Sequence, residues 1–264
     1  MKHKLKIYLA TWFILAWCAA SQQTVAAGSS SKQYTSEHII YGSPGTRGKI
    51  LYRKGYVLDY DPATKDAIWV SYHLTADYLV ANVPRTNDFR PDPDLLAGQR
   101  AELSDYRRSG YDRGHLVPAK DMRRDLQTES ETFLLSNMTP QVGEGFNRGI
   151  WEKLEFKVRL WAKQRKNIYV IDGPIFTGAN HKTIGANHVA VPDKFYKIVV
   201  SCTEKGDNID AIAFIFPNQK IAGTPLTAFI TTIDEIENET GLDFLKDLDK
   251  QIQARVEAQK ARMW

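Results

Sequence analysis

The sequence predicts a mixed α+β fold, because strand-like and helix-like segments follow one another without the regular alternation of a doubly wound domain. Strand-like segments dominate the chain before Asn147, and helical periodicity first appears there. Three more strand-like segments follow that helix, and the chain ends in charged helical segments. A chain of 264 residues is long enough to form one large domain.

Alternation of apolar and polar residues defines the first strands. In the segment 67–74, Ile68, Val70 and Tyr72 share one face. Residues 85–112 are rich in Pro, Asp, Arg and Gly, and a long irregular stretch of this kind inside a compact domain is usually functional. The predicted elements are, in chain order, strands at 49–60 (interrupted at 54–55), 67–74 and 132–137, a helix from 147, strands at 167–172, 194–202 and 210–216, and helices at 233–240 and from about 243.

The first helix is predicted to start at Asn147, a residue type that favours the N-cap position. Basic residues at 163–166 suit the far end of this helix, because they complement the negative end of its dipole. The apolar residues that recur at three- and four-residue intervals along it are Ile150, Trp151, Leu154, Val158 and Trp161.

The N-terminus has the features of a secretory signal peptide. Three lysines in the first six residues precede an apolar run over 7–20, and Val25-Ala26-Ala27 offers small residues before a cleavage point. A run of about 14 residues is shorter than the roughly 20 that span a bilayer, which favours cleavage over a permanent anchor. We therefore expect an exported protein, periplasmic or secreted, with a signal peptide at 1–27, a flexible leader at 28–37 and one domain at 38–264 whose charged helical tail starts at about residue 243.

Net charge gives no evidence for a nucleic-acid partner. Cleavage after residue 27 removes three lysines and no acidic residue, so the 35 basic and 31 acidic residues of the full chain become 32 and 31. Any basic binding surface must therefore be local. Cys202 alone remains after cleavage, which excludes an internal disulfide and a cysteine metal cluster, and its apolar strand predicts a packed core residue.

The densest group of polar residues is Asp112-Arg113-Gly114-His115, at the end of the long irregular stretch. Histidine is the side chain best suited to proton transfer near neutral pH. An adjacent arginine can pair two oxygens of a phosphate through its planar fork. On local composition alone, an ordinary surface turn is still the favoured interpretation.

A second group lies on the predicted helix, where Asn147 and Glu155 are eight residues apart. This spacing corresponds to about 80° of rotation and about 12 Å of rise, so both can contribute to one side of a site. Their oxygen atoms are the hard ligands that magnesium prefers. Taken alone, however, the two residues are better explained as an N-cap and a solvated glutamate.

Together the two groups resemble the DNA/RNA non-specific endonuclease family, whose active site is the ββα-metal (His-Me) finger. The similarity continues, in order, over nearly the whole chain after the predicted signal peptide. The resemblance implies a mainly antiparallel central sheet with flanking helices and an embedded ββα-metal finger, as in bacterial extracellular nucleases and endonuclease G. The blocks that carry it are Asp112-Arg113-Gly114-His115, residues 136–141, 147–155, 171–176 and 191–197, and Asp234-Glu235-Ile236-Glu237 with Thr240-Gly241-Leu242.

The resemblance assigns roles to individual residues. His115 would be the general base that takes a proton from the attacking water, and Asn147 the one direct protein ligand of a magnesium ion, for which Mn²⁺ is expected to substitute. Glu155 resembles the carboxylate that holds the metal's water molecules. Arg113 is similar to the family's phosphate-binding arginine, and Asn137 to the asparagine that orients the histidine or the phosphate.

Four further residues receive less definite roles from the resemblance. The family has another phosphate-binding arginine upstream of the motif, and both Arg85 and Arg90 lie in the right stretch. Arg148 is one of several basic residues around the site that can grip phosphates. Asp112 is expected to brace the turn rather than to react.

The implied reaction is hydrolysis of phosphodiester bonds in DNA and RNA, with little sequence specificity and with 5′-phosphate ends. The sequence shows no element that reads bases, and gripping of the backbone alone gives low specificity. If His115 keeps an ordinary pKa of about 6.5, activity should rise through about pH 6 to 7. The resemblance also implies a homodimer, for which the charged tail is a candidate interface.

Three alternatives stay open at this point. The protein could be a phosphodiesterase for small phosphate esters, a catalytically silent nucleic-acid-binding module, or a nuclease toxin with a cognate inhibitor protein as partner. Among the other histidines, His73 is expected to be structural. A zinc site at His181 and His188 is disfavoured, because no further ligands stand at suitable spacing.

Overall fold

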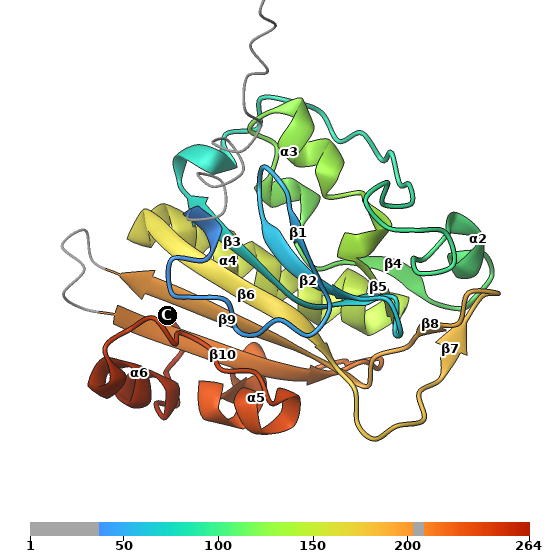
Figure 1. The fold of residues 1–264 in the computed structure, drawn as a ribbon. Helices are drawn as coiled ribbons and strands as arrows, with labels where there is room; N and C mark the ends of the chain where they lie inside the picture. The colour runs from blue at the N-terminus through green and yellow to red at the C-terminus, as the bar shows by residue number, and fades with distance from the viewer. Residues whose placement is uncertain (1–36, 203–208) are drawn as a thin grey trace, which may run out of the picture.

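The computed structural model describes residues 37–202 and 209–264 (Figure 1). The predicted signal peptide at 1–27 and nearly all of the predicted leader at 28–37 lie outside these residues. The side chain of Cys202 also lies outside the description, so its predicted place in the core stays a prediction. Within the described residues, no helix is long and apolar enough to cross a membrane.

A seven-stranded sheet forms the centre of the molecule. Its strand order is β1-β2-β3-β6-β9-β10-β11, and every neighbouring pair is antiparallel. The predicted α+β fold with a mainly antiparallel sheet is confirmed. The strands are β1 (Lys49–Tyr52), β2 (Val57–Asp61), β3 (Asp66–Thr75), β6 (Asn167–Ile175), β9 (Lys194–Cys202), β10 (Ile209–Pro217) and β11 (Ile230–Thr231).

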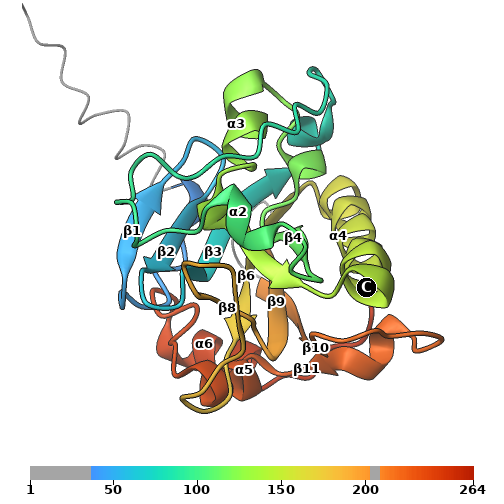
Figure 2. The same cartoon turned by 90° about the vertical axis from the view of Figure 1, so that its right-hand side faces the viewer.

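The sheet has an apolar core on each face, because side chains alternate along its strands. In β3, Val70, Tyr72 and Leu74 belong to one core and Trp69 to the other. Helix α4 covers the first face, and α5 and α6 cover the second (Figures 1 and 2). The helices are α2 (Leu103–Tyr106), α3 (Leu126–Glu131), α4 (Glu152–Arg165), α5 (Ile233–Thr240) and α6 (Lys250–Glu257).

A two-stranded ribbon lies on the α4 side of the sheet and forms the ββα finger together with α4 (Figure 2). It consists of β4 (Asp112–His115) and β5 (Met138–Gln141), paired so that His115 faces Met138. The strand predicted at 132–137 is wrong, since residues 135–137 form a short 3₁₀ turn and the strand begins only at Met138. A second small ribbon pairs β7 (Thr183–Ile184) with β8 (Val189–Ala190).

The segment between β5 and α4 also differs from the prediction. Asn147 does not cap a regular helix, because it lies inside an irregular, kinked helical segment, Gly143–Trp151, and α4 starts at Glu152. Its backbone N–H donates to the carbonyl oxygen of Val142, five residues earlier, at 2.9 Å. Gly145 has a φ of +82° within this segment, a left-handed conformation that glycine adopts at no steric cost.

The charged tail, predicted to be helical from about residue 243, becomes helical only at Lys250. Its one helix, α6, has eight residues and packs through Val256 against the second core. The chain then returns to α4, where the ring of Trp264 lies 5.4 Å from that of Trp161. The helix predicted at 233–240 is confirmed as α5, with Gly241 as its left-handed cap.

Candidate active site

His115 stands on β4 with its ring held between two phenylalanines. The ring centroids of Phe89 and Phe133 lie 5.7 Å and 5.1 Å from that of His115, both in edge-to-face geometry. At Gly114, an added Cβ would lie 2.1 Å from the buried Gln141 side chain, so glycine leaves the space in which this side chain packs against β4. The finger therefore fixes the orientation of the imidazole.

The surroundings of the imidazole favour its neutral form. Its Nε2 is buried and has no hydrogen-bond partner among the described residues. Burial, with smaller contributions from Arg85 and Arg113, lowers the pKa of His115 to about 3. The expected rise of activity through pH 6 to 7 is therefore not supported for this group, because His115 is already neutral below that range.

Asp112 joins the two parts of the site. Its carboxylate accepts a hydrogen bond from Asn147 Nδ2 at 2.9 Å and pairs with Arg148 Nη1 at 3.1 Å. Because the amide nitrogen of Asn147 is used in this bond, its Oδ1 is the atom left to act as a metal ligand. The structure thus gives Asp112 the bracing contacts that the sequence predicted.

Glu155 lies on the first turn of α4 and lines the same groove as His115 and Asn147. Burial raises the pKa of its carboxyl to about 7, opposed by Lys197 and assisted by the nearby Asp121 carboxylate. Arg159 pairs with Asp121 at 3.0 Å and also favours the ionised form of Glu155. Lys197 and Arg159 offset only part of the cost of burying the Glu155 carboxylate, so this group is suited to interact with a cation.

A buried ion pair lies beneath this part of the site. Lys197 and Asp172 are both fully buried and bonded to each other, and Nζ of Lys197 lies 4.5 Å from the ring centre of Trp151. Burial raises the pKa of Asp172 to about 6, whereas Lys197 opposes this shift. The pair anchors β6 and β9 to the residue directly before α4.

Of the catalytic candidates, His115, Arg113 and Glu155 line one groove of about 210 Å³, which continues into a larger one of about 530 Å³. Phe89, Arg113, Asn147 and Arg148 line both. The wall of the smaller groove also contains Arg85, His115, Lys120, Glu152 and Glu155. A proton acceptor, hard oxygen ligands and several cations therefore converge on one opening.

The structure separates the two arginines that the sequence left undecided. Arg85 lines the groove and lies 4.7 Å above the ring of Phe133. Arg90 instead pairs with Asp88 at 2.7 Å and is not among the residues that line the groove. Arg113 is exposed and stacks over Phe89 at 4.0 Å.

Asn137 does not line the groove. It is fully buried, its Oδ1 accepts from Val117 N at 3.0 Å, and its Nδ2 donates to the carbonyl oxygens of Val117 and Thr132. All of its polar atoms are thus used to hold the backbone that follows His115. Its position is that of a brace and not of a group that contacts phosphate.

Sequence reasoning missed the aromatic support and the buried charges. Phe89 and Phe133 are separated by more than forty positions, and no local pattern joins them to His115. Asp172 and Lys197 did stand inside the blocks 171–176 and 191–197 that carry the family resemblance, which was the one available signal. Their charges interrupt otherwise apolar strands, a cost that a supporting role at a site would explain.

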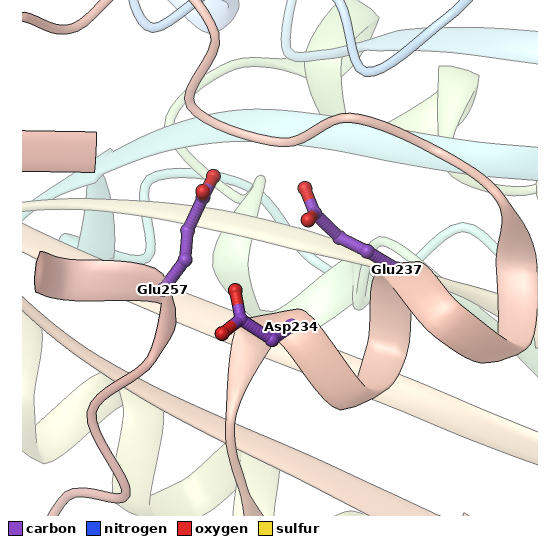
Figure 3. Close-up of side chains that lie close together, drawn as sticks. All are labelled: Asp234, Glu237 and Glu257. Carbon is purple, nitrogen blue, oxygen red and sulfur yellow. The ribbon is translucent and has the colours of Figure 1, made fainter. Parts of the chain in front are cut away.

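The remaining candidates form no comparable site. His73 stacks on Tyr169 with ring centroids 4.5 Å apart, in the structural role that was expected. His181 and His188 belong to no group of potential metal ligands within the described residues. The one such group there is Asp234, Glu237 and Glu257, on α5 and α6 across the sheet from the groove (Figure 3).

Known proteins resemble this chain over most of its length. A model of the family described as DNA/RNA non-specific endonuclease matches residues 34–251. Nuclease C1 of Cunninghamella echinulata is 42% identical over 228 residues, which cover 81% of this chain and 90% of that protein. The mitochondrial endonuclease G of Homo sapiens is 37% identical over 219 residues, which cover 79% of this chain and 73% of that protein.

The fold is similar to a solved structure as well. A crystal structure of an EndoG/EndoGI complex, concerned with the mechanism of EndoG inhibition, matches with a TM-score of 0.78 and 35% identity. The match covers 83% of this chain and 94% of that chain. The family resemblance stated from the sequence is confirmed by these comparisons.

The predicted export, to the periplasm or as a secreted protein, is wrong. Relatives whose names give a compartment are mitochondrial nucleases, among them those of Saccharomyces cerevisiae, Bos taurus and Schizosaccharomyces pombe. The signal-like pattern at 1–27 lies outside the described residues. A basic start with a short apolar run does not by itself establish export.

Proposed function

Because the chain belongs to the DNA/RNA non-specific endonuclease family, we propose that it hydrolyses phosphodiester bonds of DNA and RNA in a metal-dependent reaction that leaves 5′-phosphate ends. The observation that carries the proposal is the shared groove that His115, Asn147 and Glu155 all line. A silent binding module has no chemical need for these three groups together.

The residues present fit a hard divalent cation. Asn147 would hold it directly through Oδ1, and Glu155 through water, in agreement with the oxygen ligands that Mg²⁺ prefers. The raised pKa of Glu155 supports this fit, because a nearby cation would relieve the cost of burying its charge. When bound, Mg²⁺ would neutralise charge on the phosphate and its leaving oxygen, and Mn²⁺ is expected to substitute.

His115 performs the proton transfer. A ring nitrogen of the neutral imidazole takes a proton from a water molecule as the water oxygen forms a bond to phosphorus. The bond between phosphorus and the 3′-oxygen breaks, and the 3′-oxygen takes a proton from solvent. The phosphate stays attached to the 5′-oxygen. The low pKa of the imidazole keeps it in the acceptor form over the whole neutral range.

The arginines hold the phosphate and stabilise its added charge. Arg85 and Arg113 approach the groove over the two phenylalanine rings that flank His115, and Arg148 lines its other side. Planar guanidinium groups bind phosphate oxygens irrespective of the base attached. We therefore expect little sequence specificity and a sharp loss of activity as salt rises toward about 0.5 M.

An inhibitor protein is a further partner that we propose, since a structural relative is found in a complex with EndoGI. Such a protein would need to cover the arginine-lined groove, and an acidic surface would do so most readily. A homodimer also remains a prediction.

The test is degradation of supercoiled plasmid and of a folded RNA by the full chain, with Mg²⁺ and with EDTA. We expect both substrates to be degraded only with the metal, and end-labelling to find 5′-phosphates. Binding without cleavage across several divalent ions would contradict the proposal and favour the binding module. Cleavage of a chromogenic diester alone would favour the small-ester phosphodiesterase.

A further inference from the structure

A second groove of about 490 Å³ runs along the outer side of α4. It shares Lys120, Arg148 and Glu152 with the catalytic groove, so the two are continuous. Its lining also includes Lys153, Phe156 and Lys157 of α4, and Leu226. A nucleic-acid strand that is bound at His115 can therefore extend into this groove without leaving the surface.

The second groove contains more positively charged side chains than its own ion pairs use. Lys120 pairs with Glu152 at 3.0 Å, and Arg148 and Arg159 pair with aspartates outside the groove. Neither Lys153 nor Lys157 forms an ion pair with any described residue. Two free cations beside a phosphate-binding site complement a polyanion that passes through it.

Phe156 is the unusual member of the set. It is 56% exposed, although it lies on a helix whose other large aromatic residue, Trp161, is fully buried in the core. It stands one turn after Glu152, about 6 Å further along the helix axis. An exposed ring between lysines, close to a phosphodiester site, provides a surface on which an unpaired base can stack.

We propose that Phe156, Lys153 and Lys157 form a flanking subsite for single-stranded nucleic acid, in which Phe156 stacks on a base next to the cleaved bond and the lysines contact phosphates. The inference rests on the proposed nuclease function and adds a preference within it. Bases in a duplex are already stacked on one another, so the subsite favours unpaired strands over duplex DNA. The groove thus distinguishes substrates by strandedness rather than by sequence.

The test compares Phe156→Ala, Phe156→Trp and the double variant Lys153→Gln/Lys157→Gln with the unaltered chain. Leu126→Ala, which alters another exposed apolar residue (60% exposed), and Lys163→Gln, which alters an exposed lysine on the same helix, are matched controls outside the groove. Substrates are an unstructured single strand, a duplex of the same sequence, and a chromogenic diester too short to reach Phe156. Thermal melting confirms that each variant folds.

Removal of the stacking surface for one base is expected to lower kcat/KM on the single strand about ten-fold in Phe156→Ala, with Phe156→Trp retaining the original value. The duplex should show a decrease of less than about three-fold, and the short diester should be unaffected. The lysine variant should reduce the slope of log KM against log salt by about 0.7 for each phosphate that the protein no longer binds. The two controls should resemble the unaltered chain.

Equal decreases on all three substrates, or none on the single strand, would overturn the subsite. A change from dimer to monomer in Phe156→Ala, seen by sedimentation, would overturn it in favour of a self-association surface. Binding of a labelled single strand to His115→Ala variants with and without Phe156→Ala, measured by anisotropy, tests the subsite without turnover. If the protein binds through Phe156 yet never cleaves, the nuclease proposal fails while the subsite stands.

Discussion

Shifted titratable groups lie on both faces of the central sheet, and the two sets differ in what surrounds them. On the α4 face, Glu155 and His115 open into a groove with several arginines. On the opposite face, Glu257 lies beside Glu237 and Asp234, with carboxylate oxygens within 4.8 Å of one another (Figure 3). Burial raises the pKa of both Glu155 and Glu257 to about 7.

The difference shows that a shifted pKa alone does not identify an active site. Asp234, Glu237 and Glu257 line none of the grooves around the candidate active site. Glu155, by contrast, shares its groove with His115 and several arginines. The comparison therefore predicts large catalytic effects from changes on one face and only stability effects from changes on the other.

The largest effect is expected for His115→Ala. Removal of the general base should lower kcat by about 10³-fold with little change in the metal concentration needed, since the imidazole does not hold the metal. Steady-state cleavage of a fluorogenic DNA at saturating Mg²⁺ measures it. A decrease below about ten-fold would place the base elsewhere.

Asn147→Ala should lower the rate by about 10²-fold and, unlike His115→Ala, should raise the Mg²⁺ concentration for half-maximal rate. Asn147→Asp keeps an oxygen ligand and serves as the matched control, with part of the affinity retained. Calorimetric titration with Mg²⁺ separates binding from turnover. Unchanged metal affinity in Asn147→Ala would contradict the assignment of the ligand.

Arg85 and Arg90 allow a comparison within one loop. Arg85→Gln should reduce kcat/KM by about ten- to a hundred-fold, because Arg85 faces the groove and stabilises developing charge. Arg90→Gln should change activity by less than about three-fold and act on stability, because it removes the ion pair with Asp88. Equal kinetic decreases would show that the loop moves as a unit on binding.

The smallest effect is expected across the sheet, in Glu257→Gln. The folded-state pKa of Glu257 is raised above its ordinary value of 4.5, so the stability linked to its protonation is present below about pH 4.5 and lost as pH rises through about 7. Removing the charge should raise the melting temperature by about 2–4 °C at pH 8, and by less at pH 5, with unchanged activity. Glu235→Gln, exposed on α5, is the control. Lower stability of Glu257→Gln at pH 8 would indicate that the carboxylates do not repel one another.

Much of the fold could be predicted from periodicity. The strand at 194–202 and the helix at 233–240 have the predicted bounds, because alternation and capping residues act locally. The strand that carries His115 was missed, since Asp112-Arg113-Gly114-His115 has no apolar alternation and is held by pairing with β5. The kinked segment Gly143–Trp151, in which Asn147 N–H bonds to the carbonyl oxygen of Val142, is not revealed by any helical pattern.

The site was predictable where chemistry resides in a motif and unpredictable where it depends on contacts between distant segments. His115, Asn147 and Glu155 were identified through the family resemblance of their motifs, since their types and spacing alone favoured a surface turn, an N-cap and a solvated glutamate, and the structure brings them to one groove. The roles of Phe89 and Phe133, and the use of Asn137 as a brace, follow only from the folded chain. The predicted export was wrong because it rested only on the residue types of segment 1–27, which lies outside the described residues.

Chemical rescue of His115→Gly by imidazole is the most direct test of the catalytic face. At about pH 8, added imidazole is mostly neutral and can occupy the space left by the ring between Phe89 and Phe133. The account predicts a decrease of about 10³-fold in His115→Gly and a recovery of at least about ten-fold with imidazole, whereas Asn147→Ala should not respond. Near-normal cleavage by His115→Gly without imidazole would contradict the assignment of His115 as the base.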